Sequence, residues 1–168
     1  MGSHISRDSS SREALDSLRR IVQTLRESSR RAEQQLGISG AQLFVLEQLA
    51  DAPARSLNEL AAGTFTHQSS VSTVVARLVE QGLVSRQRST TDRRQLELVL
   101  TAGGRRLAAK TTGTAQGALI ASIEKLPSRS RHTLARLLGR VVNRMKATER
   151  KPRMFFDDHR RRSARRNV

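Results

Sequence analysis

The chain has 168 residues, and its 31 basic and 15 acidic side chains give a formal net charge of +16, which favours a polyanionic partner. Residues 146–168 hold only nine of the basic and three of the acidic side chains, so the rest of the chain is basic in its own right. The absence of cysteine excludes disulfides, thiol redox sensing and cysteine-ligated zinc, and the aromatic content of 2% argues against stacking platforms for single-stranded nucleic acid.

The N-terminal segment lacks the apolar core of a signal peptide. Met1-Gly2-Ser3-His4 resembles a cloning remnant, and we expect residues 1–11 to form this remnant and a disordered arm. No apolar run in the chain approaches the roughly 20 residues that a membrane span needs. We therefore expect a cytoplasmic, nucleoid-associated protein with no membrane partner.

A long helix is expected over residues 12–36, because apolar and small residues recur there at alternating steps of three and four. This heptad seam consists of Leu15, Leu18, Val22, Leu25, Ser29, Ala32 and Leu36. Gly37 ends the helix, and arginines cover its other faces. The seam fits a core helix of a single subunit, but its position at the end of a small chain favours an interface between two subunits.

Two capping boxes predict the starts of the next two helices. Ser39-Gly40-Ala41-Gln42 has the S-x-x-Q form and opens a helix that reaches about Ala50. Ser56-Leu57-Asn58-Glu59 has the S-x-x-E form and opens a short helix through Ala62, which Gly63 ends.

A third helix is expected over residues 68–81, with Gly82 as its C-terminal cap. Its inward face consists of Val71, Val74, Val75, Leu78 and Val79. The pattern then changes to a period of two, which predicts strands over residues 83–88 and 95–100. Leu96, Leu98 and Leu100 share one face of the second strand. A polar loop joins the two strands, so the segment forms a β-hairpin.

Thr101 is expected to cap a helix that runs to about Leu126, and Pro127 lies at the start of a last helix. The apolar stripe of that last helix consists of Leu134, Leu137, Leu138, Val141, Val142 and Met145. The predicted fold is mainly α-helical with a small β-hairpin wing. Two short helices followed by a hairpin have the order of a winged helix-turn-helix, so we expect a DNA-binding domain of this type over residues 37–100.

Residues 148–168 form a basic C-terminal tail. Five arginines in this tail are expected to add nonspecific contacts to DNA phosphates. They are Arg160, Arg161, Arg162, Arg165 and Arg166.

The second helix of a helix-turn-helix presents its N-terminal half to the major groove of DNA. In residues 68–81 the outward face carries short polar side chains and one arginine, with no acidic residue before Glu80. The candidate DNA-binding residues are Gln68, Ser69, Ser70, Ser72, Thr73 and Arg77. Glutamine can pair with adenine, hydroxyls with base edges or phosphates, and arginine with guanine or phosphate. The alternative is a merely polar helix that faces solvent.

The hairpin adds Arg88, Arg93 and Arg94 to the candidate DNA-binding residues. A thin, arginine-rich hairpin can enter the minor groove, whose negative potential attracts arginine. Asp92 is expected to accept hydrogen bonds from a nearby arginine and so fix the tip of the hairpin. The alternative is a solvated turn with incidental charges.

Four segments together resemble the MarR (multiple antibiotic resistance regulator) family: Ser72-Thr73, residues 77–86, residues 92–94 and residues 98–104. The resemblance covers about residues 12–147 and is most specific over residues 69–104. It implies a homodimer joined by N- and C-terminal dimerisation helices, here residues 12–36 and 101–147. Such a dimer binds a pseudo-palindromic operator in double-stranded DNA, usually as a repressor. It maps the family's recognition helix onto residues 68–81 and its wing onto Asp92 and Arg94. The family also includes sensors of small-molecule effectors, but the sequence identifies no effector-binding residues here.

No residue set supports catalysis or a cofactor. The histidines His4, His67, His132 and His159 are scattered, so no metal site is expected. Ser69 and Ser70 lie near His67 at a helix start, where sequence neighbours rarely form a nucleophilic site. We therefore expect a DNA-binding transcription regulator and not an enzyme. The alternative is a basic nucleoid-associated or architectural protein with low sequence specificity.

Overall fold

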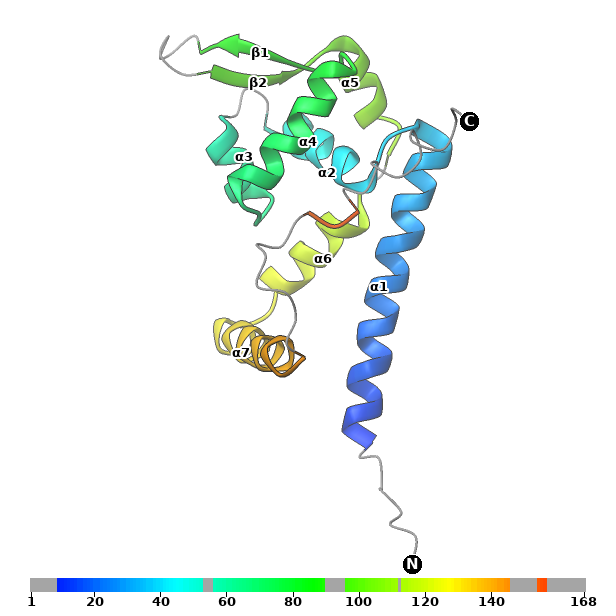
Figure 1. The fold of residues 1–168 in the computed structure, drawn as a ribbon, viewed down its shortest axis with the longest axis vertical. Coiled ribbons are helices and arrows are strands. Elements are labelled where there is room, and N and C mark those ends of the chain that lie inside the picture. The colour runs from blue at the N-terminus through cyan, green and yellow to red at the C-terminus, as the bar shows by residue number, and fades with distance from the viewer. Residues whose placement is uncertain (1–8, 53–55, 90–95, 112, 146–153, 157–168) are drawn as a thin grey trace, which may run out of the picture.

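The computed structural model describes residues 9–52, 56–89, 96–111, 113–145 and 154–156. Within these ranges the chain forms seven helices and one two-stranded antiparallel sheet, which confirms the mainly α-helical fold with a β-hairpin. In chain order the elements are α1 (Ser9–Leu36), α2 (Gly40–Asp51), α3 (Leu57–Gly63), α4 (Gln68–Glu80), β1 (Val84–Arg88), β2 (Leu96–Leu100), α5 (Ala102–Ala108), α6 (Ala115–Glu124) and α7 (Ser128–Arg144). Helix α1 extends as a long arm from the cluster around α2, and α6 leads from that cluster to α7 (Figure 1).

Helix α1 begins at Ser9, earlier than predicted, and ends before Gly37, whose φ of +70° is the left-handed conformation expected of a glycine stop. Its last turns dock on the rest of the chain. The hydroxyl of Ser29 accepts a hydrogen bond from Gly40 N at 3.4 Å, and the hydroxyl of Ser28 accepts one from Ala115 N at 3.4 Å. The C-terminal part of α1 is therefore fixed to the starts of both α2 and α6.

The core forms around α2, in which seven of the 12 residues are buried. Both predicted capping boxes are confirmed. In the first, the Ser39 hydroxyl accepts from Gln42 N while the Gln42 side chain accepts from Ser39 N. In the second, Ser56 and Glu59 exchange the same pair of bonds. Helices α1, α3, α4 and α5 and strand β2 pack against α2, so this helix is the centre of the packed cluster.

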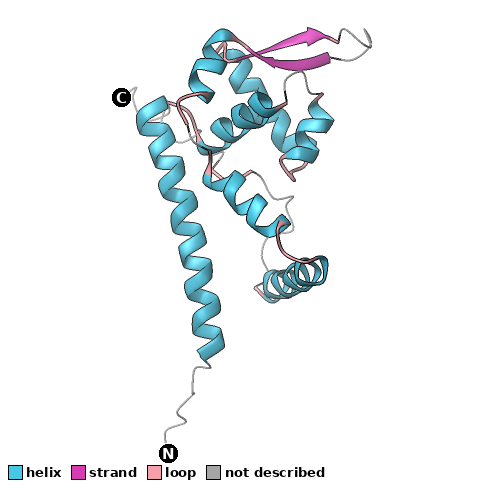
Figure 2. Cartoon of the chain, turned by 180° about the vertical axis from the view of Figure 1, so that it is seen from behind, coloured by secondary structure: helices cyan, strands magenta, loops and turns pink. Residues whose placement is uncertain are grey.

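Strands β1 and β2 pair antiparallel, with Val84 opposite Leu100 and Arg88 opposite Leu96. Gly82 has a φ of +67° and makes the turn from α4 into β1, as predicted. Leu98 and Leu100 are buried, but Leu96 is 58% exposed. The three leucines share one face of β2, as predicted, but Leu96 lies outside the core because the hairpin projects beyond the core at its far end (Figure 2).

The prediction of a single helix from Thr101 to about Leu126 is wrong, because the chain forms two helices there. Thr101 caps α5 as predicted, and its hydroxyl accepts from Gly104 N. Helix α5 ends at Ala108, and Gly113 then takes a φ of +111° before Thr114 caps α6. Glu47 of α2 accepts hydrogen bonds from both the backbone N and the hydroxyl of Thr114. Gly113 supplies the positive φ at the break, and the contact between Glu47 and Thr114 adds a tertiary restraint.

Part of the predicted basic tail joins the core. Met154 is 4% exposed and belongs to the same buried cluster as the residues of α2. Phe155 and Phe156 lie beside it and line a small pocket with Leu25 and Leu43. The five tail arginines from Arg160 to Arg166 lie outside the described residues. A truncation that tests them should therefore begin after Phe156.

Candidate nucleic-acid interface

Helix α4 presents one face to the core and the other to the surface. Val71, Val74, Val75 and Leu78 are fully buried, which confirms four of the five predicted inward positions. Val79, the fifth, is only partly buried. The helix packs against α2, α3 and β1, so its orientation is fixed by three elements of the core. Its remaining face is exposed or partly exposed and carries the candidate DNA-binding residues.

The candidate residues on α4 form what we call the recognition face: Gln68, Ser69, Ser70, Ser72, Thr73 and Arg77. Gln68, Ser69 and Thr73 are exposed, and the others are partly exposed. The Thr73 hydroxyl donates to the Ser69 carbonyl at 3.1 Å, which leaves its lone pairs available to a donor outside the chain. The first turn of α4 has no acidic residue. The face is therefore polar, closely approachable and unopposed by negative charge in its first turn.

The start of α4 has no side-chain cap. His67 occupies the N-cap position with an extended backbone (φ −68°, ψ 140°), and its side chain makes no capping hydrogen bond. The backbone conformation already suits a cap, so only the side-chain acceptor is missing.

Replacing His67 by serine should raise the free energy of unfolding by about 0.5–1 kcal/mol, because a serine hydroxyl can accept from the first-turn amides. Chemical denaturation of both proteins measures this difference. The reverse change is made at Ser39, which already caps α2. Ser39→Ala removes that cap and should lower the free energy of unfolding by about 1 kcal/mol or more. An unchanged or lower stability of His67→Ser would contradict the assignment of His67 as an unused cap.

The turn between α3 and α4 holds a residue that the sequence did not single out. Phe65 has a φ of +51° and is 67% exposed. The predicted helix stop, Gly63, is instead the last residue of α3, and the left-handed position falls on Phe65. This conformation costs a non-glycine residue roughly 1–2 kcal/mol. Helices commonly place a glycine at the position after the cap, which here follows Thr64. The absence of glycine at that position was the one available signal that a non-glycine residue takes the left-handed conformation.

The first strand of the hairpin, β1, follows α4 in the chain, packs against it and carries two arginines. Arg86 and Arg88 are exposed on β1, and Arg88 lies at its far end opposite Leu96. Arg86 was not among the candidate residues, although its alternation with Arg88 places both side chains on one face of the strand. Asp92, Arg93 and Arg94 lie outside the described residues, so their DNA-binding roles stay predictions.

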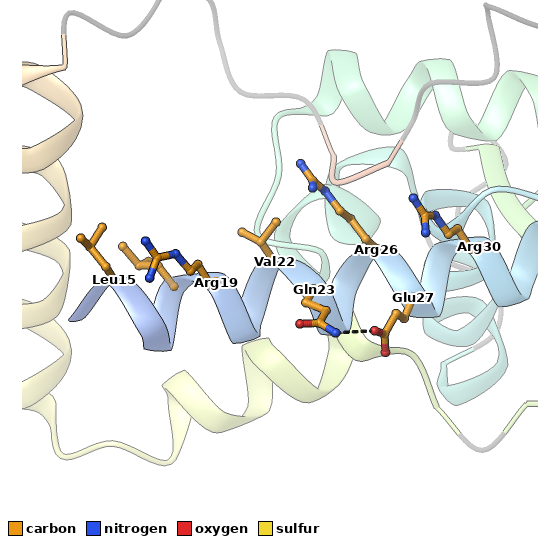
Figure 3. A pocket seen from close by; sticks show the side chains of 8 residues that line it. Leu15, Arg19, Val22, Gln23, Arg26, Glu27 and Arg30 are labelled. Carbon is orange, nitrogen blue, oxygen red and sulfur yellow. Dashed lines mark hydrogen bonds between the residues drawn. The ribbon is translucent and has the colours of Figure 1, made fainter. Parts of the chain in front are cut away.

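A second surface is apolar and uncovered. On α1 the N-terminal part of the heptad seam is exposed: Leu15, Leu18 and Val22 are 52%, 40% and 41% exposed, whereas Leu25, Ser29 and Ala32 are buried in the same chain. An open groove of about 530 Å³ lies along this part of α1, with leucine and valine beside arginine side chains (Figure 3). Gln23 donates to Glu27 at 2.8 Å along its edge. The core-helix interpretation therefore applies to the C-terminal half of the seam, while the subunit interface expected for the exposed N-terminal half stays a prediction.

Helix α7 carries a second exposed apolar stripe. It has no buried residue, and its stripe of Leu137, Leu138, Val141, Val142 and Met145 is 40–72% exposed. Leaving so many large apolar side chains in water is costly, because burying each one stabilises by about 1.5–3 kcal/mol. We call the exposed apolar residues of α1 and α7 the arm surface.

The described ranges hold neither a candidate metal site nor a candidate membrane-spanning helix. They contain no group of three or more His, Cys, Asp or Glu side chains that could hold a metal ion. Within the same ranges, no helix combines the length and apolarity required to cross a bilayer.

Residues 36–95 match the model of the MarR family. This range contains α2, α3, α4 and β1, which are the elements that carry the recognition face and the base of the hairpin. The predicted resemblance to this family is confirmed. No curated protein matches the chain.

Solved structures show the same fold at low identity. The chain is 22% identical to a MepR-like protein crystallised with pseudoligands, covering 86% of this chain and 97% of that one, with a TM-score of 0.50. It is 21% identical to the transcriptional regulator BldR from Sulfolobus solfataricus (79% and 94% covered, TM-score 0.52). It is 23% identical to wild-type MarR from E. coli in the apo form (76% and 95% covered, TM-score 0.52). The fold is therefore that of MarR-type winged-helix transcription regulators.

Proposed function

Because residues 36–95 match the MarR family and α4 presents a polar face beside a basic hairpin, we propose that this chain is a sequence-specific, double-stranded-DNA-binding transcription regulator. It is a regulator and not an enzyme. The observation that carries the proposal is the division of α4 into a fully buried valine–leucine face and a recognition face of small polar side chains with Arg77. Such a helix can enter the major groove closely enough to read base edges.

The roles of the individual residues belong to this proposal. Gln68, Ser69, Ser70, Ser72, Thr73 and Arg77 contact bases and phosphates in the major groove. Arg88, Arg93 and Arg94 contact the flanking minor groove, where Asp92 orients the tip. The +16 charge of the chain supplies the long-range attraction to the duplex.

The protein acts as a homodimer, in which the arm surface of one subunit packs on that of a second copy. The arm surface comes from the two ends of the described chain, α1 and α7, and its residues are exposed in the single subunit. A second copy is the occupant because it supplies the same apolar stripes in a symmetric arrangement. Two recognition helices then meet a pseudo-palindromic operator with half-sites about 34–36 Å apart.

We assign repression as the regulatory outcome, as the resemblance to the family implies. Release by a small-molecule effector is part of the proposal, and its support is that a protein of similar fold was crystallised with pseudoligands. A ligand would release DNA only if it bound more tightly to a dimer whose recognition helices are wrongly spaced. The protein acts on the nucleoid in the cytoplasm and needs no cofactor.

Arg77→Ala and Arg94→Ala should each weaken binding to a duplex selected by the wild-type protein from a random library, by at least about tenfold, without unfolding the protein. Arg94→Ala should also lower the salt dependence of binding, because a phosphate contact is lost. Arg136→Ala on α7 removes the same charge away from α4 and serves as the control. Titration by fluorescence anisotropy at several salt concentrations measures both effects. Unchanged affinity in both variants would remove this mapping of the interface.

The high net charge supports a second candidate, a basic architectural protein with little sequence preference. Competition between the selected duplex and random duplex separates the two. A regulator should prefer its site by about 10³-fold or more, whereas an architectural protein should bind both about equally.

A further inference from the structure

We propose that Phe65 is a direct DNA contact, whose ring packs against an apolar part of the duplex when α4 enters the major groove. The proposal rests on the proposed DNA-binding function and adds a residue that lies outside the polar recognition face. Its evidence is a combination of conformation, exposure and position in the chain.

The conformation of Phe65 is imposed by the end of α3. Phe65 N donates to the Ala62 carbonyl at 3.1 Å, and Thr66 N donates to the Ala61 carbonyl at 3.0 Å. These two bonds form a Schellman-type helix end, which requires a left-handed residue at this position. The buried Thr64 hydroxyl donates to the Leu60 carbonyl at 2.8 Å and holds the preceding residue in place. The turn is therefore well determined, and glycine would suit it better than phenylalanine.

The side chain of Phe65 contributes little to the fold, because 67% of it is exposed. Among the described residues of 37–100, the large apolar side chains with high exposure are Phe65 and Leu96. Leu96 lies at the far end of the hairpin opposite Arg88, and Phe65 lies just before the start of α4. Both positions adjoin elements that we assign to DNA. A strained residue with a bare aromatic ring is explained by an external partner and not by folding.

The position of Phe65 places it within reach of the duplex. Phe65 precedes Gln68, the first residue of α4, by three positions, so its Cα lies within about 11 Å of that of Gln68. The N-terminal residues of a recognition helix are those that approach base edges. A phenyl ring there can contact the methyl group of thymine or the apolar edge of a deoxyribose. Both are carbon surfaces of the same duplex, and only the first is removed when thymine is replaced by uracil.

The test compares wild type with Phe65→Gly and Phe65→Asn, since glycine and asparagine both tolerate the left-handed conformation. Both variants should unfold at a higher temperature, by about 2–4 °C for glycine. Both should bind the duplex selected by the wild-type protein about tenfold more weakly. The salt dependence of binding should not change, because no charge is removed. This opposite movement of stability and affinity is not expected of a residue with a merely structural role.

Replacing thymine by uracil in the selected duplex identifies the contact. If the ring packs on a thymine methyl, the replacement weakens wild type but not Phe65→Gly; if it packs on deoxyribose, both proteins tolerate the replacement. Phe155→Ala removes an aromatic ring of 50% exposure elsewhere and should leave affinity unchanged.

The proposal is overturned if Phe65→Gly binds as tightly as wild type, if it is less stable, or if it alters the oligomeric state. The proposed function fails separately, when the wild-type protein itself shows no preference for any selected duplex.

Discussion

Replacing Leu138 by glutamate should convert the protein to monomers and lower its affinity for the selected duplex by about three orders of magnitude. Leu138 lies in the exposed stripe of α7, between Leu137 and Val141, and is 40% exposed in the single subunit. In the proposed dimer this side chain is buried against the second copy. A carboxylate there would lose its hydration without gaining a partner, which is far more costly than the loss of one apolar contact.

The effect on DNA binding follows from the loss of one recognition helix. A monomer reads one half-site, so it keeps the nonspecific attraction of its basic surface but loses the second set of base contacts. Specific binding is typically about 10³–10⁷ tighter than nonspecific binding, and a loss of about 10³ lies at the low end of that range. The helical content of the monomer should stay close to that of wild type, because α7 buries no residue in its own chain.

Asn143→Glu is the matched control for the Leu138 variant. It adds the same charge to the same helix, but at 100° per residue Asn143 points about 140° away from Leu138. We expect this variant to remain a dimer with unchanged affinity. Analytical ultracentrifugation of all three proteins measures their masses. A Leu138→Glu variant that sediments as a wild-type dimer would mean that α7 does not join the subunits.

Replacing Gly104 by alanine should destabilise the protein by about 3 kcal/mol or more, or prevent its folding. Gly104 is buried in the first turn of α5, where its N donates to the hydroxyl of the Thr101 cap. A Cβ at Gly104 would lie 2.1 Å from the carbonyl oxygen of Leu83. That carbonyl is backbone, and it also accepts hydrogen bonds from Thr101 N and its hydroxyl. Neither segment can move without breaking the junction between the hairpin and α5.

Gly103→Ala provides the comparison, because the two glycines are adjacent in the same helix. A Cβ at Gly103 would have its nearest contact at 3.6 Å, which is ordinary packing distance. Alanine is also preferred over glycine in a helix by about 1 kcal/mol, so this variant should be as stable as wild type or more stable. Thermal unfolding of both variants measures the difference. Equal stability of the two would contradict the close approach of α5 to Leu83.

The features that the sequence predicted correctly depend on local interactions. The capping boxes at Ser39 and Ser56 bond residues three apart, and Gly37 and Gly82 stop helices through their own backbone conformation. The period of 3.6 residues likewise separates the buried face of α4 from the recognition face. The capping boxes, the glycine stops and the helical period each depend on residues close in sequence, so they can be predicted without the tertiary structure.

The errors arise where a distant residue decides the local conformation. The start of α6 is held by Glu47, which lies 67 positions before Thr114 in the chain and accepts a hydrogen bond from Thr114 N. Met154 enters the core across a segment whose composition predicts a solvated tail. Phe65 is a local exception: the hydrogen bonds at the end of α3 require a left-handed residue there, although phenylalanine disfavours this conformation.

The heptad seam of α1 shows a different limit. Its period predicts an apolar face correctly but does not say which surface covers that face. Leu25 and Ala32 are buried within the single chain, whereas Leu15 and Leu18 are exposed in it. Periodicity is identical in the two halves, so only the position of α2 and α6 along α1 separates them.

The central claim is that two copies of α4 enter the major groove of one duplex. Hydroxyl-radical and methylation-interference footprinting of the selected duplex tests it most directly. We predict two symmetric blocks of protection on one face of the duplex, about 34–36 Å apart between centres, with purine contacts inside each block. One unpaired block, or uniform protection along the whole duplex, would contradict the claim.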